Sequence, residues 1–212
     1  SLLKEFCLCI DDRVPRDRHI IAANEGNAIA LAAGYYLANK SIPLVYMQNS
    51  GLGNAVNPLL SLCDPEVYSI PMLVMIGWRG EPGVKDEPQH IKQGKIQLEL
   101  LETMNIAYVI ISKDDKNYSS KILNAITTAK NENRPVVLLM RKGAFEKYGT
   151  TIPKVKTHQM LREEALEIIM NHLDKNAIIV STTGKTSREI YEIREKRGQS
   201  HQQEFLTVGS MG

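Results

Sequence analysis

The sequence has little cysteine and no marked excess of either charge. Three cysteines occur among 212 residues, and their positions fit neither a disulfide framework nor the spacing of zinc ligands. Reduced cysteines in the core are the simpler interpretation, and they favour a cytoplasmic location. The formal net charge of +2 comes from 26 basic and 24 acidic residues. This balance argues against a nucleic-acid or membrane-surface partner, which would need a strongly basic face.

Long apolar runs are missing as well. No run reaches the roughly 18 residues that a membrane span needs, and the first residues lack the pattern of a secretory signal. We therefore expect no membrane partner. What is present is an ordinary globular composition, 43% hydrophobic and 24% charged, large enough for one large domain or for one domain and part of another.

Short apolar segments alternate with helical patterns over about two thirds of the sequence. The predicted strands are Ile20–Ala23, Pro43–Met47, Pro71–Gly77, Ala107–Ile111 and Pro135–Met140. The predicted helices are Leu2–Asp11, Gly26–Asn39, Asn54–Ser61, 91–104 and Ser119–Asn131. This alternation predicts an α/β fold in which helices cover both faces of a parallel sheet. In such sheets a ligand binds outside the carboxyl ends of the strands.

A second α/β unit is expected after a linker over residues 146–160. Its predicted elements are a helix over Leu161–Leu173, a strand over Ala177–Val180, a helix over Arg188–Arg197 and a strand over Phe205–Val208. We expect this second domain, residues 161–212, to be truncated and to continue past Gly212. The string Gly184-Lys185-Thr186 is not a phosphate loop, because Ile179 stands where that motif needs a glycine.

Glu25 stands between the predicted strand and the alanine-rich helix that follows it. Burying a carboxylate between two apolar elements costs several kcal/mol unless it is paired or neutralised, so we expect a partner or a raised pKa. The simpler alternative is an acidic residue at a helix N-terminus, which the helix macrodipole favours. Position alone leaves both interpretations open.

Two further polar segments follow predicted strands. Gln48–Asn54 contains two glycines, which let backbone approach a ligand closely. The next helix begins here, so its free N–H groups can bind an anion. The alternative to a ligand site is a capped helix start. The long segment Trp78–His90 combines Arg79, Lys85 and His90 with three acidic residues. It is interpreted as a binding loop or, alternatively, as a solvated surface loop. Arginine and lysine there would suit an anionic substrate.

Three strings together resemble the thiamine-diphosphate-dependent 2-oxo acid decarboxylases. They are ANEGNAIALAAGYYL at 23–37, QNSGLGN at 48–54 and RGEPGVKDEPQH at 79–90. The resemblance covers essentially the whole sequence. It implies the three-layer thiamine-diphosphate-binding fold, with residues 1–145 as the pyrimidine-binding domain and residues 161–212 as the beginning of the diphosphate-binding domain.

The resemblance also implies roles for matching residues. Glu25 matches the glutamate that hydrogen-bonds N1′ of the cofactor's aminopyrimidine and thereby activates the thiazolium carbon that attacks the 2-oxo group. Asn49, Ser50 and Gly51 match the turn that lies beside the pyrimidine. Gln89 and His90 match polar groups over the thiazolium, where substrate binds. Arg79 and Lys85 are our own inference for the anionic group of the substrate.

The implied activity is decarboxylation of 3-phosphonopyruvate to phosphonoacetaldehyde and carbon dioxide, in phosphonate biosynthesis. The family binds the diphosphate through Mg²⁺, held by a Gly-Asp-Gly segment and an asparagine. No Gly-Asp-Gly occurs in this sequence, so we expect the metal ligands beyond Gly212. The family's cofactor lies between two chains, which implies a homodimer or a higher homo-oligomer.

Two alternatives stay open. A sulfonate and a phosphonate are both tetrahedral anions, so the substrate could instead be sulfopyruvate. The chain could also be a non-catalytic pyrimidine-type subunit that needs a separate diphosphate-domain chain. The beginning of a second domain argues against that alternative, because such a subunit would stop near Lys147.

Overall fold

The computed structural model describes residues 2–151 and 159–209. The chain divides into two compact units, Ser1–Ile152 and Pro153–Met211, and each is described by itself. The predicted linker at 146–160 spans this division, and its residues 152–158 lie outside the described residues. Within the described ranges no helix is both long and apolar enough to cross a membrane.

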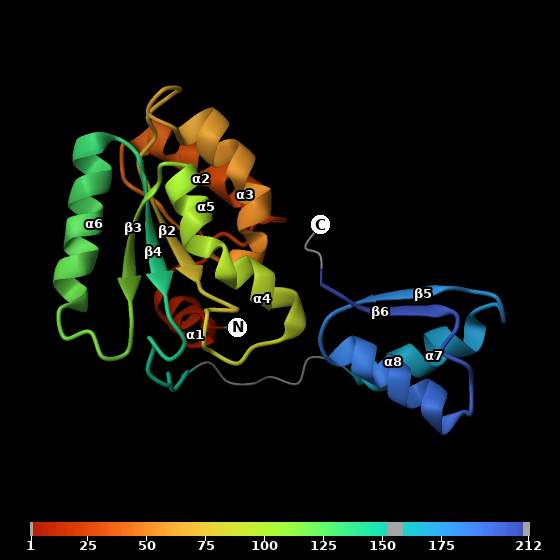
Figure 1. Cartoon of the computed structure of the whole chain (residues 1–212). Helices are drawn as coiled ribbons and strands as arrows, with labels where there is room; N and C mark the ends of the chain where they lie inside the picture. Colours follow the sequence, from red (N-terminus) through yellow and green to blue (C-terminus); the bar gives the residue numbers. More distant parts are fainter. Residues whose placement is uncertain (1, 152–158, 210–212) are drawn as a thin grey trace. The chain divides into compact units, whose positions relative to one another are not determined.

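A four-stranded parallel sheet forms the centre of the first unit (Figure 1). The strand order is β1-β2-β4-β3. The strands are β1 (Leu44–Gln48), β2 (Met72–Gly77), β3 (Ala107–Ile111) and β4 (Pro135–Met140). Every residue of the two central strands β2 and β4 is buried, as expected when both faces of a parallel sheet are covered. The predicted α/β fold is therefore confirmed.

Helices pack on both faces of this sheet and make three layers. The helices are α1 (Lys4–Arg13), α2 (Glu25–Asn39), α3 (Leu52–Pro58), α4 (Pro88–Lys95), α5 (Gln97–Thr103) and α6 (Tyr118–Glu132). On one face, Ile29 of α2 and Leu101 of α5 belong to the same buried cluster as Ile76 of β2. On the other face, Phe6 of α1 and Ala129 of α6 pack in the second cluster.

The predicted strand Ile20–Ala23 is wrong. The side chains of Ile20 and Ile21 are 65% and 85% exposed, and the segment pairs with no strand of the described sheets. Apolar composition indicates a strand only where a neighbouring strand supplies hydrogen bonds, and β1 is bonded to β2 alone. The segment is anchored at its start by His19, whose Nε2 lies 2.5 Å from the hydroxyl of Tyr46 on β1.

Two predicted helices differ in detail from the structure. The helix expected over 54–61 begins earlier, as the 3-10 turn η1 (Asn49–Gly51), continues as α3 and ends in the π-helical stretch η2 (Leu59–Cys63). Pro58 precedes the π-helical stretch, and its missing N–H removes one α-helical hydrogen bond. The helix expected over 91–104 is two helices, α4 and α5, because the backbone of Ile96 leaves the helical region.

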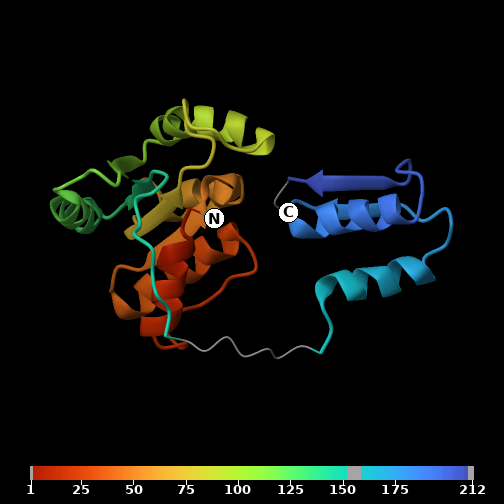
Figure 2. The same ribbon diagram turned by 90° about the horizontal axis from the view of Figure 1, so that it is seen from below.

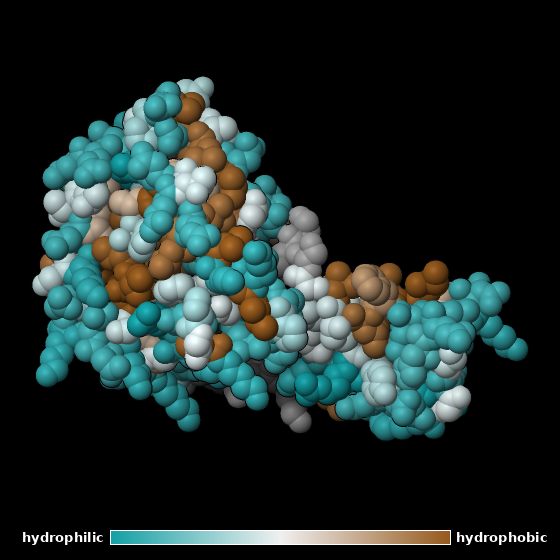
Figure 3. Space-filling view, viewed as in Figure 1, coloured by the Kyte–Doolittle hydropathy of each residue, from teal (hydrophilic) through white to brown (hydrophobic). Residues whose placement is uncertain are grey.

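The second unit contains a two-stranded parallel sheet with both of its helices on one side (Figures 1 and 2). Its elements are α7 (Arg162–His172), β5 (Ile179–Thr182), α8 (Lys185–Lys196) and β6 (Glu204–Val208). Ile190 and Ile193 of α8 are buried. Val180 and Phe205 on the strands are 66% and 65% exposed, and apolar side chains are visible over β5 in the space-filling view (Figure 3).

Candidate active site

The carboxyl ends of β1, β2 and β4 bring the predicted polar segments to one edge of the sheet. Gln48 at the end of β1 pairs with Gly77 of β2, and Gly77 pairs with Met140 of β4. The turn η1 and the segment from Trp78 leave the sheet side by side from these positions. This is the edge at which a parallel sheet binds its ligands.

Glu25 is the first residue of α2, and its side chain is half-buried at this edge. Asn24 caps the helix by accepting a hydrogen bond from the Asn27 N–H at 2.9 Å. The carboxylate Oε2 of Glu25 accepts a hydrogen bond from the amide Nδ2 of Asn54 at 3.2 Å. The expected partner is therefore a neutral amide on α3. The macrodipole alternative also holds in part, because Glu25 lies in the first turn of α2.

Glycines make the close packing around Glu25 possible. A Cβ atom at position 51 would lie 2.1 Å from Oε1 of Glu25, so a larger residue there would displace the carboxylate from this position. A Cβ atom at position 26 would lie 2.7 Å from the carbonyl oxygen of Asn54, so Gly26 lets α2 approach α3. The absence of side chains at these two glycines lets the carboxylate pack against the η1 turn.

Asn49 joins the η1 turn to the segment that follows β2. Its side chain is 4% exposed, its Nδ2 donates to the carbonyl oxygen of Arg79 at 2.7 Å, and its Oδ1 accepts from the Arg79 N–H at 3.0 Å. The side chain predicted to bind cofactor is thus engaged with backbone on both of its polar atoms. Ser50, the next residue, is half-exposed.

The guanidinium of Arg79 is paired within its own loop. Its Nε donates to Oδ2 of Asp86 at 2.7 Å, its Nη2 contacts Oδ1, and its Nη1 lies 3.4 Å from Oε1 of Gln48. Asp86 also accepts from the N–H groups of Gly80 and Glu87, each at 2.8 Å. The hydrogen bonds from Arg79, followed by those from the backbone, hold the pKa of Asp86 far below its usual range. The positive charge expected for a substrate anion is therefore compensated by Asp86.

His90 lies in the first turns of α4, which Pro88 begins. The imidazole is half-buried, and its Nδ1 is buried without a hydrogen-bond partner among the described residues. Burial lowers the pKa of His90, and the nearby charge of Arg79 lowers it further, while Asp86 and Glu87 oppose the shift. The neutral imidazole is favoured, so Nδ1 can donate or accept according to its tautomer.

Two glycines press α4 against the start of the loop. A Cβ atom at position 80 would lie 1.9 Å from the carbonyl oxygen of His90, and one at position 94 would lie 1.9 Å from the carbonyl oxygen of Gly80. The indole N–H of Trp78 donates to the Gly94 carbonyl at 2.9 Å. These backbone contacts fix α4, and with it His90, beside the sheet edge.

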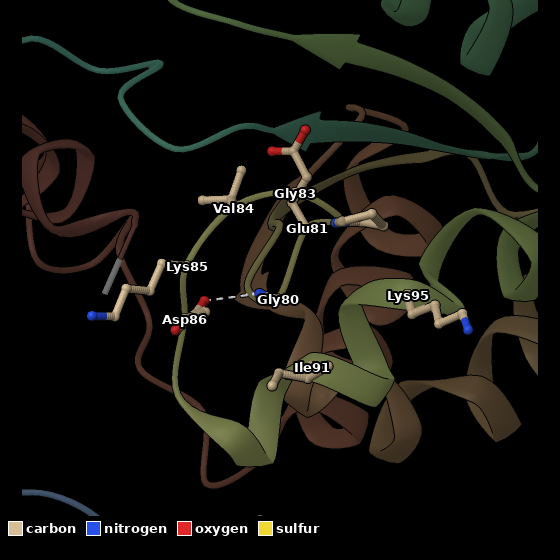
Figure 4. Close-up of a pocket in the computed structure, with 9 residues that line it drawn as sticks. Gly80, Glu81, Gly83, Val84, Lys85, Asp86, Ile91 and Lys95 are labelled. Atoms are coloured by element: carbon tan, nitrogen blue, oxygen red, sulfur yellow. Dashed lines mark hydrogen bonds between the residues drawn. The ribbon is translucent and has the colours of Figure 1, made fainter.

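Lys85 lies on the other side of this loop, at a shallow hollow (Figure 4). The hollow has a volume of 540 Å³ and is lined mainly by the loop and by Ile91 and Lys95 of α4. In Figure 4 the amino groups of Lys85 and Lys95 extend away from the hollow. Glu81 forms an ion pair with Arg141, whose Nε lies 2.8 Å from Oε1 of Glu81. Gln89 is exposed.

The predicted residues thus fall into two groups. Contacts connect Glu25 to Gly51, Asn49 to Arg79, and the loop to His90. Lys85 and Gln89 are exposed. Sequence reasoning missed Asn54 and Asp86: both lie inside the quoted strings, but an asparagine in a helix start and an acid in a charged loop are common on surfaces.

Residues 4–106 match the family described as thiamine pyrophosphate enzyme, N-terminal TPP binding domain. The phosphonopyruvate decarboxylase of Streptomyces viridochromogenes is 34% identical over 213 residues, which covers 93% of this chain and 52% of that protein. The phosphonopyruvate decarboxylase of Streptomyces hygroscopicus is 32% identical over 218 residues, covering 96% of this chain and 52% of that protein.

A shorter relative matches a smaller part of the chain. The sulfopyruvate decarboxylase subunit alpha of Methanococcus maripaludis is 37% identical over 123 residues, covering 58% of this chain and 71% of that subunit. The chain spans about half the length of the two Streptomyces relatives.

Proposed function

Because the chain belongs to the thiamine pyrophosphate enzyme family, we propose that the complete protein decarboxylates 3-phosphonopyruvate to phosphonoacetaldehyde and carbon dioxide. The proposal is supported by two phosphonopyruvate decarboxylases that align with 93% and 96% of the chain. The observation that carries the site is Glu25, a carboxylate held at the ligand-binding edge by Asn54 and by the space at Gly51.

The residues at this edge suit the aminopyrimidine half of thiamine diphosphate. A pyrimidine ring with hydrogen-bonding nitrogens needs a carboxylate to pair with, and the Glu25 carboxylate, which accepts one hydrogen bond from Asn54, would supply it. The buried and unpartnered Nδ1 of His90 offers a second polar contact. When bound, the cofactor supplies the electron sink that the loss of carbon dioxide requires.

The chain's own groups would act on protons and orientation. Glu25 would share a proton with N1′ of the aminopyrimidine, and the Asn54 amide would keep Oε2 in place during that exchange. His90, favoured as the neutral imidazole, would contact the substrate's polar atoms. The pyrimidine would lie against Asn49, Ser50 and Gly51. Its contacts there would be mainly with backbone, since the Asn49 side chain is hydrogen-bonded to Arg79.

For the substrate anion we propose Lys85, which is exposed in this loop, together with Gln89 and His90. Arg79, predicted for the same role, is paired with Asp86 and would need to exchange that partner for the substrate. Exchange is unfavourable because it would leave the Asp86 carboxylate without its main partner.

The larger assembly is also a proposal. Residues 1–145 would bind the pyrimidine and residues 161–212 would begin the diphosphate domain, with the Mg²⁺ ligands beyond Gly212. A homodimer or higher homo-oligomer would complete the site. A cytoplasmic location is supported by the cysteines Cys7, Cys9 and Cys63, which are free.

Replacing Glu25 with Gln in the complete protein tests the proposal. We expect turnover of phosphonopyruvate to fall at least a hundredfold, because the amide cannot exchange the proton. Glu87→Gln, which removes an exposed carboxylate from the neighbouring loop, is the matched control and should keep turnover within about twofold. Near-normal turnover by Glu25→Gln would remove Glu25 from the mechanism. Measuring kcat/KM for sulfopyruvate alongside decides between the two substrates.

The match to an alpha subunit supports a second candidate function. In that case the chain would be a pyrimidine-type subunit that needs a separate diphosphate-domain chain. Calorimetry with thiamine diphosphate and Mg²⁺ tests both candidates. We expect no tight binding to residues 1–212 alone and strong binding to the complete chain. Restoration of binding only by a second, different chain would favour the subunit function.

A further inference from the structure

The loop before α4 is closed into a ring by one carboxylate. Asp86 accepts hydrogen bonds from the Arg79 side chain and from the Gly80 N–H at the beginning of the loop, and from the Glu87 N–H at its end. Its side chain is only 12% exposed. Charge-assisted hydrogen bonds are shorter and stronger than neutral ones, so these contacts hold the beginning and the end of the loop together.

The beginning of this ring is held to the sheet edge. Asn49 binds both backbone polar groups of Arg79, and the Arg79 guanidinium also reaches Gln48. Position 79 is therefore tied to the η1 turn, and Glu25 packs against the same turn at Gly51.

The end of the ring sets the start of α4. Glu87, bonded to Asp86 through its N–H, directly precedes the helix. The carbonyl of His90 then lies against Gly80, close enough that no side chain fits there. Because α4 contacts the η1 turn, displacing the ring would move α4, and His90 with it, relative to that turn.

We propose that Arg79 and Asp86 form a positioning pair that keeps α4 against the η1 turn and His90 half-buried, and that Arg79 stabilises this loop and does not bind the substrate anion. The inference rests on the proposed function only in assigning His90 to the site. Its structural part concerns the chain without any ligand.

The groups around His90 shift its pKa in opposite directions. Burial and Arg79 lower it, whereas Asp86 and Glu87 raise it. If Asp86 acted by charge alone, its neutralisation would leave Arg79 uncompensated and lower the pKa of His90 further. If Asp86 holds His90 in place, its neutralisation exposes the imidazole to water, and the pKa rises toward its ordinary value.

The test is an NMR titration of the complete protein with ¹³C at the histidine Cε1 atoms, the His90 signal being assigned with a His90→Gln variant. We expect the pKa of His90 to rise by about 0.5 or more in Asp86→Asn. Arg79→Lys is the second variant, in case Asp86→Asn does not fold. It keeps the positive charge but loses the two parallel hydrogen bonds, so a rise there reports position alone. Glu87→Gln, the control, should give a small fall.

A fall or no change of the His90 pKa in both Asp86→Asn and Arg79→Lys would overturn the proposal. Steady-state kinetics supply a second readout. A positioning pair predicts that Arg79→Lys lowers kcat about tenfold or more with little change in KM, because His90 is displaced. A rise in KM for the oxo acid at unchanged kcat would instead make Arg79 a substrate ligand and would also overturn the proposal. If the unmodified protein had no decarboxylase activity, the proposed function would fail while the titration still tested the positioning pair.

Discussion

The two units of the chain are stabilised by different means. In the first unit, β2 and β4 are buried along their whole length, and helices cover both faces of the sheet. In the second unit, the strands β5 and β6 have exposed apolar side chains, and ion pairs connect the elements. Arg194 and Glu204 make the most buried of these pairs, at 2.9 Å, without the alignment of a hydrogen bond. The first unit should therefore respond mainly to changes in packing and the second mainly to changes in charge.

The largest effect is expected from a cavity in the first unit. Ile76 on β2 is fully buried, and Ile76→Ala should lower the free energy of unfolding by about 2–5 kcal/mol. Denaturant titration followed by the fluorescence of Trp78, the single tryptophan, measures this unit directly. Hydrogen exchange of α8 should stay unchanged. Loss of protection in α8 would show that the two units unfold together.

A charge change should have the complementary effect in the second unit. Glu204 contacts both Arg194 and His201, and its side chain is 5% exposed. Glu204→Gln leaves the Arg194 charge largely buried without its partner, which should destabilise this unit by about 2–4 kcal/mol. Hydrogen exchange of β5 and α8 measures the loss, with the exposed Glu192→Gln on α8 as control. Equal effects of the two variants would contradict a role for the buried pair.

Adding a methyl group should have opposite effects on stability at two glycines of the first unit. At Gly94 a Cβ would meet the Gly80 backbone at 1.9 Å, whereas at Gly34 it meets nothing within 4 Å. Gly94→Ala should destabilise this unit by about 1–3 kcal/mol through strain, and Gly34→Ala should stabilise α2 by about 0.5–1 kcal/mol. Thermal unfolding followed by Trp78 fluorescence measures both. A neutral Gly94→Ala would mean that α4 can shift from the loop at little cost.

The smallest expected effect is the response of stability to pH, which should have opposite signs in the two units. Hydrogen bonds to Glu195 and then Glu204 raise the pKa of His201, so its contribution is present below the ordinary histidine pKa and is lost as pH rises through the folded value. The pKa of His90 is lowered, so its contribution is present above the ordinary value and is lost as pH falls. Between about pH 5 and 8 the second unit should weaken as pH rises and the first as pH falls.

Hydrogen exchange at several pH values, resolved by peptide, measures both responses. His201→Gln should remove the trend in the second unit and His90→Gln the trend in the first. The same sign in both units would contradict the assignment of these two histidines.

The sequence was sufficient for most of the fold. The strands at 107–111 and 135–140 match the structure at both ends, because uninterrupted apolar runs between turn residues are typical of parallel strands. The strand predicted over residues 20–23 is wrong, although these residues are equally apolar. A strand also needs a neighbouring strand to bond with, and composition does not reveal whether one is present. The break at Ile96 was also missed, since the apolar pattern continues across it.

For the site, sequence reasoning found the positions better than the partners. Glu25, the η1 turn and the loop were all identified, and the turn and loop do leave the same sheet edge. The pairing of Arg79 with Asp86 could not be predicted, because a loop with three acids and three bases allows many pairings. The contact of Gly51 with Glu25 depends on the approach of two helices that are distant in sequence.

The strand order has a consequence for how the chain folds as it is synthesised. β4, the last strand of the first unit to be made, lies between β2 and β3. Until residues 135–140 have left the ribosome, β2 and β3 have no common neighbour, and β3 has no bonded neighbour in the described sheet. The η1 turn and the loop after β2 are therefore made early but gain their rigid platform late. A pause in translation before residue 135 would hold the chain as a two-stranded intermediate with one exposed apolar edge.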